Sequence, residues 1–313
     1  MASAITAWAV TTGEAGMRTQ ARGLAQAVAG TVIEKTAPAR WPWGAKGAKD
    51  DRFEPPWPDL LITCGRRSVP LSIALRKRAG GQMITVHIQD PRADAAAFDL
   101  VVAMEHDRIA AGPKVIKVAT ALHDLTPAKL AAAAARWRDR FEALGGPLVG
   151  VSIGGTTRRG AFTLAHGRDL IDGLQRLRRE AGASLAVTPS RRTPPATRAL
   201  LRNAFGDDPG VFLWDMTGDN PYRAILALAD RLVVTGDSVS MISEALATGH
   251  PVEVFDLGFA RYAPFLDGLI ARGLVRRFVG EPIPRHAANP MNATAEAAAA
   301  VRGLLQARTG VVG

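Results

Sequence analysis

Residues 231–255 read RLVVTGDSVSMISEALATGHPVEVF, and this stretch predicts the fold of the chain around it. The apolar runs at its two ends, RLVVT and PVEVF, are typical of strands that are buried on both faces of a parallel sheet. Between them, a small polar loop leads into a short helical segment that ends at a Gly-His-Pro turn. A strand, a helix and a second strand in succession predict an α/β domain.

The same succession occurs throughout the chain. Near the start, ITAWAV, TTGEAG and MRTQARGLAQAVAG follow one another as a strand, a glycine loop and a helix. Nearly half the chain later, PLVGVSI, GGTTRRG and AFTLAHGRDLIDGLQRLRRE repeat this order. We interpret further short apolar runs as strands: LLITC, MITVHI, DLVVAM, KVIKVA, SLAVT and VFLW. The segments expected as helices are SVPLSIALRKRAG, PAKLAAAAARWRDRFEALGGP, PATRALLRNAF, NPYRAILALAD and AEAAAAVRGLLQAR.

Two starts of this kind predict two doubly wound, Rossmann-like α/β domains rather than one long sheet. The Gly-Gly-Pro sequence at 145–147 follows a long helix and marks a natural border. We therefore expect an N-terminal domain over 1–145, a C-terminal domain over 146–288, and a last helix within 289–313 that packs back on the N-terminal domain. Residues 41–59, WPWGAKGAKDDRFEPPWPD, are expected to form an exposed loop.

Charge and composition narrow the choice of partners. The 39 Lys+Arg exceed the 29 Asp+Glu, and the formal net charge of +10 favours a phosphate-bearing substrate or an anionic membrane surface. Aromatic residues make up 6% and are not interleaved with basic ones, so nucleic acid is not expected. No stretch reaches the roughly 20 apolar residues of a membrane span, and MASAITAWAV is interpreted as a strand rather than a signal peptide. The single cysteine, Cys64, fits a buried position in a reducing compartment. We expect a cytoplasmic protein that can bind peripherally to the inner face of the cytoplasmic membrane.

The first candidate site is the loop TTGEAG, which lies at the carboxyl end of the first predicted strand. Ligands of doubly wound sheets bind at this end of the strands. Gly13 and Gly16 allow the backbone to approach a ligand, and Glu14 can act as a general base. The alternative is that Glu14 is a solvated loop acid near a helix start.

The second candidate site is the loop GGTTRRG, together with TPSRRTP after the next strand. The glycines open a turn, the threonine hydroxyls can donate hydrogen bonds, and the arginines can bind phosphate in a bidentate manner. The alternative is a glycine turn that carries two solvated arginines. The residues concerned are Gly154, Gly155, Thr156, Thr157, Arg158, Arg159, Ser190, Arg191 and Arg192.

The third candidate site is the start of the helical segment in the opening stretch. Ser238, Val239 and Ser240 lie where free backbone N–H groups and the positive end of the helix dipole face an incoming anion. Glu244 follows Ser240 by four positions and therefore shares its face of the helix. A diphosphate at the helix start would place a ribose near Glu244. The alternative is that Ser240 caps the helix while Glu244 forms a surface ion pair.

Further polar residues follow predicted strands or precede helices. Asp90 in HIQDPR is either an acceptor ligand or base, or an Asx-turn residue. His123 in ALHDL is either a base or a structural histidine. Asp219, Asn220, Tyr222 and Asp237 are open to both pocket and turn roles. No cluster at metal-ligand spacing is present, so neither a metal nor another cofactor is expected.

The pattern D-S-x-S-M-I-S-E-A-x-x-x-G-x-P resembles the donor-site region of GT-B glycosyltransferases. The combination of TTGEAGM, IQDPR, GGT, W-D-x-T-G-x-N-P-Y and TGDSVSMISEA is similar, over nearly the full chain, to the "elongated mitochondria" family. Plant members of that family are linked to mitochondrial fission, and bacterial members are described as GT-B-like glycosyltransferases. The resemblance implies a GT-B-like fold in which two Rossmann-like domains face each other across a cleft.

The resemblance also implies roles for individual residues. Glu244 would contact the ribose, and Gly13 and Gly16 would face the acceptor. One GT-B glycosyltransferase, which adds N-acetylglucosamine in peptidoglycan synthesis, has a histidine in its first glycine loop. This chain has Glu14 there instead, so the identity of the base is left open. The diphosphate would be contacted by Ser238, Ser240 and the backbone of Met241, and the same pocket would be lined by Gly154, Gly155 and Thr156.

The expected function is transfer of a sugar from a nucleoside-diphosphate donor to a cell-envelope or lipid-linked acceptor. The alternative is a non-catalytic adaptor or membrane-associated scaffold that retains the fold. An epimerase or dehydrogenase with a Rossmann fingerprint and a Tyr-x-x-x-Lys pair is not expected, because neither Tyr222 nor Tyr262 is followed four positions later by lysine.

Overall fold

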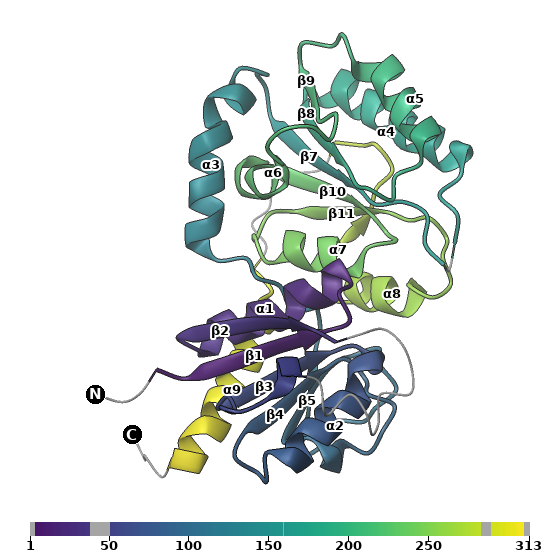
Figure 1. Ribbon diagram of the computed structural model, residues 1–313. Coiled ribbons are helices and arrows are strands. Elements are labelled where there is room, and N and C mark those ends of the chain that lie inside the picture. Colours follow the sequence, from purple (N-terminus) through teal and green to yellow (C-terminus); the bar gives the residue numbers. More distant parts are fainter. Residues whose placement is uncertain (1–3, 38–50, 159, 283–288, 310–313) are drawn as a thin grey trace. The chain divides into compact units, whose positions relative to one another are not determined.

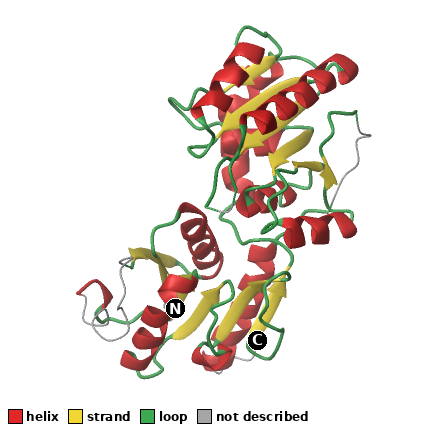
Figure 2. Cartoon of the chain, turned by 90° about the vertical axis from the view of Figure 1, so that its right-hand side faces the viewer, coloured by secondary structure: helices red, strands yellow, loops and turns green. Residues whose placement is uncertain are grey.

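The computed structural model describes residues 4–37, 51–158, 160–282 and 289–309. The chain forms two compact units. Unit 1 combines Met1–Asp124 with Asn292–Gly313, and unit 2 is the continuous segment Leu125–Met291. The first strand and the last helix of the chain therefore both belong to unit 1 (Figure 1). Helices cover both faces of each sheet (Figure 2).

Unit 1 is built on a six-stranded parallel sheet with the order β2-β1-β3-β4-β5-β6. Its strands are β1 (Thr6–Thr11), β2 (Thr31–Thr36), β3 (Leu60–Cys64), β4 (Ile84–Ile88), β5 (Leu100–Met104) and β6 (Val115–Val118). The chain extends the sheet first to one side of β1 and then to the other. The loops after β1 and β3 consequently flank a topological switch point, the usual ligand position in such sheets.

The alternation of side chains along β3 explains how the two faces of this sheet are covered. Leu60, Ile62 and Cys64 point to the face covered by α1 (Ala15–Val28) and α9 (Ala293–Thr309). Leu61 points to the opposite face, which is covered by α2 (Val69–Arg78) and by Phe53. Short 3-10 helices occur at Asp51–Phe53, Arg66–Ser68 and Ala95–Ala97.

Helix α1 lies very close to the segment that leaves unit 1. A Cβ atom on Gly23 would come within 2.2 Å of the carbonyl oxygen of His123. The backbone N–H of His123 donates to Oγ1 of Thr294, which donates back to the His123 carbonyl, at 2.8 and 2.9 Å. Arg22 donates to Asp124 at 2.8 Å. These contacts hold the segment that leaves unit 1, at His123 and Asp124, and the start of α9, at Thr294, against each other and against α1. They also require glycine at position 23.

Unit 2 is built on a second six-stranded parallel sheet with the order β12-β11-β10-β7-β8-β9. Its strands are β7 (Leu148–Ile153), β8 (Ser184–Pro189), β9 (Val211–Leu213), β10 (Arg231–Thr235), β11 (Val252–Phe255) and β12 (Arg276–Arg277). The switch point here lies between β7 and β10. The loops after these two strands are therefore adjacent, although they are about 80 residues apart in sequence.

Helices cover both faces of the unit 2 sheet. α4 (Leu164–Ala181) and α5 (Pro195–Phe205) contribute leucines and Phe205 to one apolar core. α3 (Pro127–Glu142) packs on α6 (Tyr222–Leu228), which contacts β7. α7 (Val239–Leu246) packs on β10 and β11, and α8 (Ala263–Ala271) follows β11.

The structure confirms two doubly wound parallel α/β sheets and shows where the sequence analysis differs. No pattern in the sequence predicted β2, β12 or α8. β2 is an edge strand whose exposed Glu34 and half-buried Lys35 hide its strand character. The units divide at residue 124 rather than 145, because α3 packs on α6 of unit 2. The last helix, α9, packs on α1 within unit 1.

Residues 41–50 of the predicted exposed loop lie outside the described residues; within 51–59 most side chains are exposed as predicted, but Phe53 and Pro58 are buried and Trp57 is half-buried. Phe53 is fully buried and packs edge-on against Trp8, with 6.3 Å between ring centroids. Trp57 packs on the same Trp8 at 5.9 Å. Aromatic side chains in this segment thus complete the core of unit 1.

Candidate functional site

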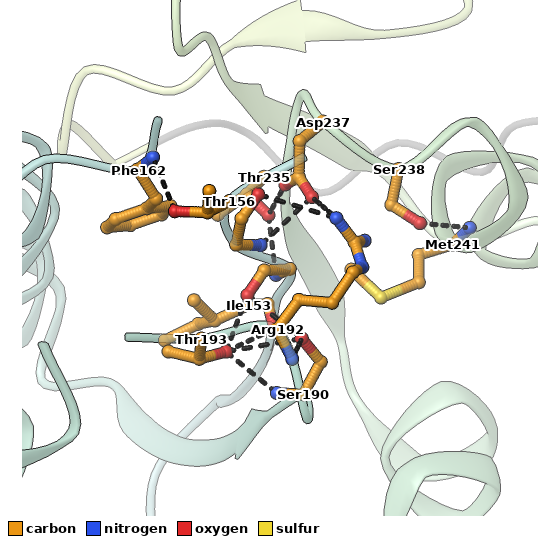
Figure 3. A network of polar contacts seen from close by, with 12 residues as sticks. Ile153, Thr156, Phe162, Ser190, Arg192, Thr193, Thr235, Asp237, Ser238 and Met241 are labelled. Atoms are coloured by element: carbon orange, nitrogen blue, oxygen red, sulfur yellow. Dashed lines mark hydrogen bonds and ion pairs between the residues drawn. The ribbon is translucent and has the colours of Figure 1, made fainter. Parts of the chain in front are cut away.

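Three loops of unit 2 converge on one buried carboxylate, that of Asp237 (Figure 3). Asp237 follows β10, and its side chain is 0% exposed. It accepts hydrogen bonds from the backbone N–H of Gly155 at 2.9 Å, from Oγ1 of Thr235 at 2.7 Å and from Nη1 of Arg192 at 2.6 Å. One carboxylate therefore joins the loops that follow β7, β8 and β10.

Two glycines make this convergence possible. A Cβ atom on Gly154 would lie 2.2 Å from Oδ2 of Asp237, and one on Gly155 would lie 1.9 Å from the carbonyl oxygen of Arg192. The Gly154 N–H donates to Thr235 at 2.7 Å, and the Thr156 N–H donates to the Arg192 carbonyl at 3.2 Å. The amides of this loop are thus occupied by protein acceptors. A ligand would meet its exposed Thr156 hydroxyl and its arginines instead.

The loop after β8 is tied to the loop after β7 by hydroxyl groups. Ser190 donates to the Gly154 carbonyl at 2.9 Å, and Thr193 donates to the Ile153 carbonyl at 3.1 Å. Arg192 is thereby fixed next to the switch point, yet its side chain remains 41% exposed. Arg191 and Arg158 are exposed at the same edge of the sheet.

Helix α7 begins directly after Asp237. Ser238, rather than Ser240, is its N-cap, and its hydroxyl accepts from the Met241 N–H at 3.4 Å. The first turn of a helix leaves N–H groups without intrahelical acceptors, here those of Val239 and Ser240. Figure 3 shows Ser238 and Met241, at this positive end of the helix, beside the Arg192–Asp237 pair.

Glu244 lies one turn further along α7 and is 9% exposed. The hydroxyl of Tyr222, at the start of α6, donates to its Oε2. Burial first, and then the neighbouring Glu244 carboxylate, raise the pKa of Tyr222 well above its ordinary value. The phenol therefore stays protonated and acts as a donor to Glu244. The alternative of an exposed Glu244 at the surface does not fit this burial.

The first glycine loop lies at the switch point of unit 1. Gly13 has φ +97°, a conformation that favours glycine, and Gly16 lies in the first turn of α1. Oγ1 of Thr12 donates to Oε2 of Glu14 at 2.5 Å. Arg67, which follows β3, pairs with Glu14 at 3.5 Å. The Glu14 side chain is 42% exposed, so it is held in place while remaining accessible to solvent.

The other two candidate bases are less accessible. Asp90 accepts from the Arg92 N–H at 2.9 Å in an Asx turn and pairs with the Arg92 side chain at 3.1 Å; the Asp90 side chain is 9% exposed. His123 is 2% exposed, and its ring nitrogens have no hydrogen-bond partner among the described residues. Burial lowers its pKa. Both residues are in unit 1, and none of their polar contacts joins them to Glu14.

The hydrogen bonds that hold the loops of this site together were not predicted from the sequence. Thr193 and Thr235 carried no signal, because an isolated threonine beside a strand is common. Asp237 was left as either a pocket residue or a loop acid, and Arg192 was not distinguished from Arg191. A signal was available in Gly154-Gly155, since adjacent glycines at a strand end indicate a close approach of another chain segment. Among the described residues, no three His, Cys, Asp or Glu side chains gather as metal ligands.

The two doubly wound parallel units and the loops at their switch points define a GT-B-like protein. UDP-GlcNAc 2-epimerase from Methanocaldococcus jannaschii has this fold, with a TM-score of 0.58 and 10% identity over 96% of this chain and 99% of that one. The UDP-GlcNAc 2-epimerase from Neisseria meningitidis, solved with UDP-GlcNAc bound, gives a TM-score of 0.53 and 12% identity over 97% of this chain and 100% of that one.

The family described as "Mitochondrial fission ELM1" matches residues 15–305, and the chain belongs to this family. It is 33% identical over 282 residues to the mitochondrial fission protein ELM1 of Arabidopsis thaliana. The match covers 82% of this chain and 66% of the plant protein. Within the described ranges, no helix combines the length and the apolar character that crossing a membrane requires.

Proposed function

We propose that this chain binds a nucleoside-diphosphate sugar in unit 2 and transfers the sugar to an acceptor. The observation that carries the proposal is the support given to Arg192. A fully buried carboxylate, itself held by Gly155 and Thr235, fixes a guanidinium that remains 41% exposed. A solvated arginine needs no such support, whereas a phosphate-binding arginine gains from being held in one geometry.

The diphosphate is expected to lie at the start of α7. The N–H groups of Val239 and Ser240 offer donors, and Arg192 offers a positive charge at the same edge of the sheet. The hydroxyl of Thr156 accepts from the Phe162 N–H at 3.1 Å and can still donate its own proton to a phosphate oxygen. We expect Gly154 and Gly155 to shape the loop and not to donate to the ligand.

Glu244 is the proposed ribose contact. It lies on the helix that would hold the diphosphate, and Tyr222 orients its carboxylate. A carboxylate accepts hydrogen bonds from ribose hydroxyls, so ribonucleotides should bind better than 2′,3′-dideoxynucleotides. The UDP-GlcNAc 2-epimerases of M. jannaschii and N. meningitidis, which have this fold, were solved with UDP-GlcNAc bound, so uridine nucleotides are the first ligands to test.

The proposed reaction is an attack by an acceptor hydroxyl on the anomeric carbon of the donor. The bond from the acceptor oxygen to that carbon forms, the bond from the carbon to the phosphate oxygen breaks, and the nucleoside diphosphate leaves with the electron pair. Arg192 and the start of α7 stabilise the charge that develops on the leaving group. Glu14 is the proposed base for the acceptor proton, because it is the most exposed of the three candidates Glu14, Asp90 and His123.

We further propose that the acceptor is presented at the inner face of the cytoplasmic membrane, as a lipid-linked or cell-envelope molecule. The net charge of +10 supports attraction to anionic lipid. Co-sedimentation with vesicles that contain phosphatidylglycerol should therefore weaken as salt rises from 50 to 500 mM, roughly the range over which surface charges become screened. Binding that is independent of salt and of lipid charge would contradict this.

Calorimetric titration with UDP, GDP, ADP and UDP-GlcNAc tests the donor site. One of these ligands should bind the wild-type chain, and Arg192→Ala and Glu244→Gln should each weaken it about tenfold or more, as expected for lost charge-assisted hydrogen bonds. Arg179→Ala is the matched control, since Arg179 is an exposed arginine on α4. Equal affinity in all four proteins, or no binding of any nucleotide, would refute the donor site.

A non-catalytic role as an adaptor is the second candidate, favoured by the name of the family and of its plant member. Product analysis separates the two roles. A transferase releases nucleoside diphosphate faster when an acceptor is supplied, whereas an adaptor binds a nucleotide without consuming it or binds none. An epimerase would instead change the sugar of UDP-GlcNAc without any acceptor.

A further inference from the structure

Unit 2 carries a groove that the proposed donor site does not use. It lies at the carboxyl end of β9, between α3 and residues 214–219. Two adjoining hollows form this groove: the larger, of about 530 Å³, lies on the α3 side of β9, and the smaller, of about 360 Å³, lies on the α5 side. They share the residues Arg140, Phe212, Leu213, Trp214 and Asp215. A cavity volume of this order accommodates a small organic molecule.

Four arginines line the groove: Arg136, Arg140, Arg198 and Arg202. The guanidinium of Arg140 lies over the ring of Phe212, with its carbon 4.5 Å from the ring centroid. This stacking occupies the flat face of the guanidinium and leaves its edge N–H groups for a ligand. Arg198 donates to the thioether sulfur of Met216 at 3.2 Å, a weak acceptor that an oxyanion would replace.

The formal charge of the groove suits a dianion. The four arginines are opposed by two acidic lining residues among those described, Asp215 and Asp219, which leaves a formal charge of +2. Asp219 is already paired with Arg136. A phosphate monoester carries about −1.5 to −2 at neutral pH and matches this balance, whereas a simple carboxylate does not.

The aromatic walls and Asp215 indicate the rest of the ligand. The rings of Trp137 and Phe212 meet edge to face at 5.5 Å, and Trp214 is fixed by a hydrogen bond from its Nε1 to the Thr217 carbonyl at 2.8 Å. Such half-buried indole faces pack well against the C–H face of a sugar ring. Asp215, which lines both hollows, accepts from the N–H and the hydroxyl of Thr217 through Oδ1, and these bonds hold its carboxylate in place. A carboxylate in this position can accept hydrogen bonds from sugar hydroxyls.

We propose that this groove binds a sugar phosphate, with the phosphate held by Arg140, Arg198 and Arg202 and the sugar packed on Trp137 and Trp214. The site shares no residue with the Arg192–Asp237 network or with Glu244, so it stands or falls independently of the proposed donor site. A phosphate monoester on a ring that bears hydroxyl groups occurs in free sugar phosphates and in the headgroup of phosphatidylinositol 4-phosphate. The experiment below distinguishes these two sources.

The test uses the full chain and compares four ligands by calorimetry and by quenching of tryptophan fluorescence. The ligands are glucose 6-phosphate, N-acetylglucosamine 1-phosphate, inorganic phosphate and phosphatidylcholine vesicles with or without phosphatidylinositol 4-phosphate. We expect a sugar phosphate or the inositol lipid to bind at least tenfold more tightly than inorganic phosphate. Arg202→Ala and the double variant Arg140→Ala/Arg198→Ala should weaken that binding about tenfold or more.

The variants and controls keep the outcome decisive. Arg202 is exposed, so its replacement should leave folding intact even if loss of the stacked Arg140 loosens the groove. Arg179→Ala should bind like the wild type, and Glu244→Gln should retain groove binding while losing nucleotide binding. Binding of the free ligand alone identifies a soluble sugar phosphate, and binding of the vesicles alone identifies a lipid headgroup. Failure of both, or binding that Arg202→Ala and the double variant leave unchanged, overturns the proposal.

Discussion

Replacing Asp237 by asparagine tests whether the buried carboxylate holds the site together. The substitution keeps the size of the side chain but removes its charge and leaves one acceptor oxygen for three donors: Gly155 N–H, Arg192 Nη1 and Thr235 Oγ1. Hydrogen bonds to a charged acceptor contribute about 1.5–3 kcal/mol, against about 0.5–1.5 kcal/mol for neutral ones. The Gly155 bond therefore loses about 1 kcal/mol, and the partly exposed Arg192 pair and the Thr235 bond together lose about 1 kcal/mol more.

We thus expect unit 2 to be destabilised by about 2 kcal/mol, which corresponds to a fall in Tm of roughly 4–8 °C for a domain of this size. Urea unfolding followed by circular dichroism at pH 7 measures the change. Asp267→Asn is the matched control, because Asp267 is 61% exposed and pairs with Arg277 at 3.1 Å, a surface ion pair whose loss costs about 0–1 kcal/mol. Nucleotide affinity should fall in Asp237→Asn, since Arg192 loses its support. If Asp237→Asn behaves like the control in both measurements, the carboxylate does not organise the site.

Four further substitutions probe the packing and the buried charges. Gly155→Ala should destabilise unit 2 by about 1–3 kcal/mol in urea unfolding, because its Cβ would lie 1.9 Å from a carbonyl oxygen, while Gly268→Ala in α8 meets open space and should be neutral or stabilising. Gly23→Ala should destabilise unit 1 by a similar amount, and a neutral result would contradict the close contact with His123. Burial lowers the pKa of His87 to about 3, so below about pH 6.5 the unfolded chain binds a proton that the native chain does not bind. The free energy of unfolding of unit 1 should therefore fall by about 1.4 kcal/mol for each pH unit below 6.5. His87→Gln should reduce this slope. Burial raises the pKa of Glu253 to about 6 against the opposing effect of Arg231, so between about pH 4.5 and 6 the native chain keeps a proton that the unfolded chain releases. The free energy of unfolding of unit 2 should therefore fall by about 2 kcal/mol as the pH rises over this range. Glu253→Gln, measured over the same range, should abolish that change.

The sequence predicted the elements that are apolar on both sides. Strands such as Leu60–Cys64 and Arg231–Thr235 coincide with their apolar runs, because a strand buried on both faces needs apolar side chains at nearly every position. The edge strand Thr31–Thr36 was missed for the opposite reason, as one side of it meets solvent. The positions of Phe53 and Trp57 were not predicted, because both pack on Trp8, a residue more than 40 positions away that no local pattern reveals.

The candidate site was predicted in outline and not in its contacts. Loops at strand ends, glycines and a helix start are local features, so Gly154, Gly155 and Ser238 could be identified. Which arginine is held, and by which acid, depends on the strand order, which brings Asp237 beside Arg192 across 45 residues of sequence. Epimerases were not expected because the chain lacks a Tyr-x-x-x-Lys pair, yet UDP-GlcNAc 2-epimerases are among the proteins that have the present fold.

The discontinuity of unit 1 has a consequence for protein synthesis. The alanine-rich face of α9 completes the apolar core formed by α1 and the first sheet, through Ala293, Ala297 and Val301. This helix is synthesised after the whole of the continuous unit 2. Until α9 has been made, the apolar surface that it covers in unit 1 is exposed and can associate with other chains. A chain truncated just before Asn292 should accordingly have an unstable unit 1, the part that is made first, and a folded unit 2.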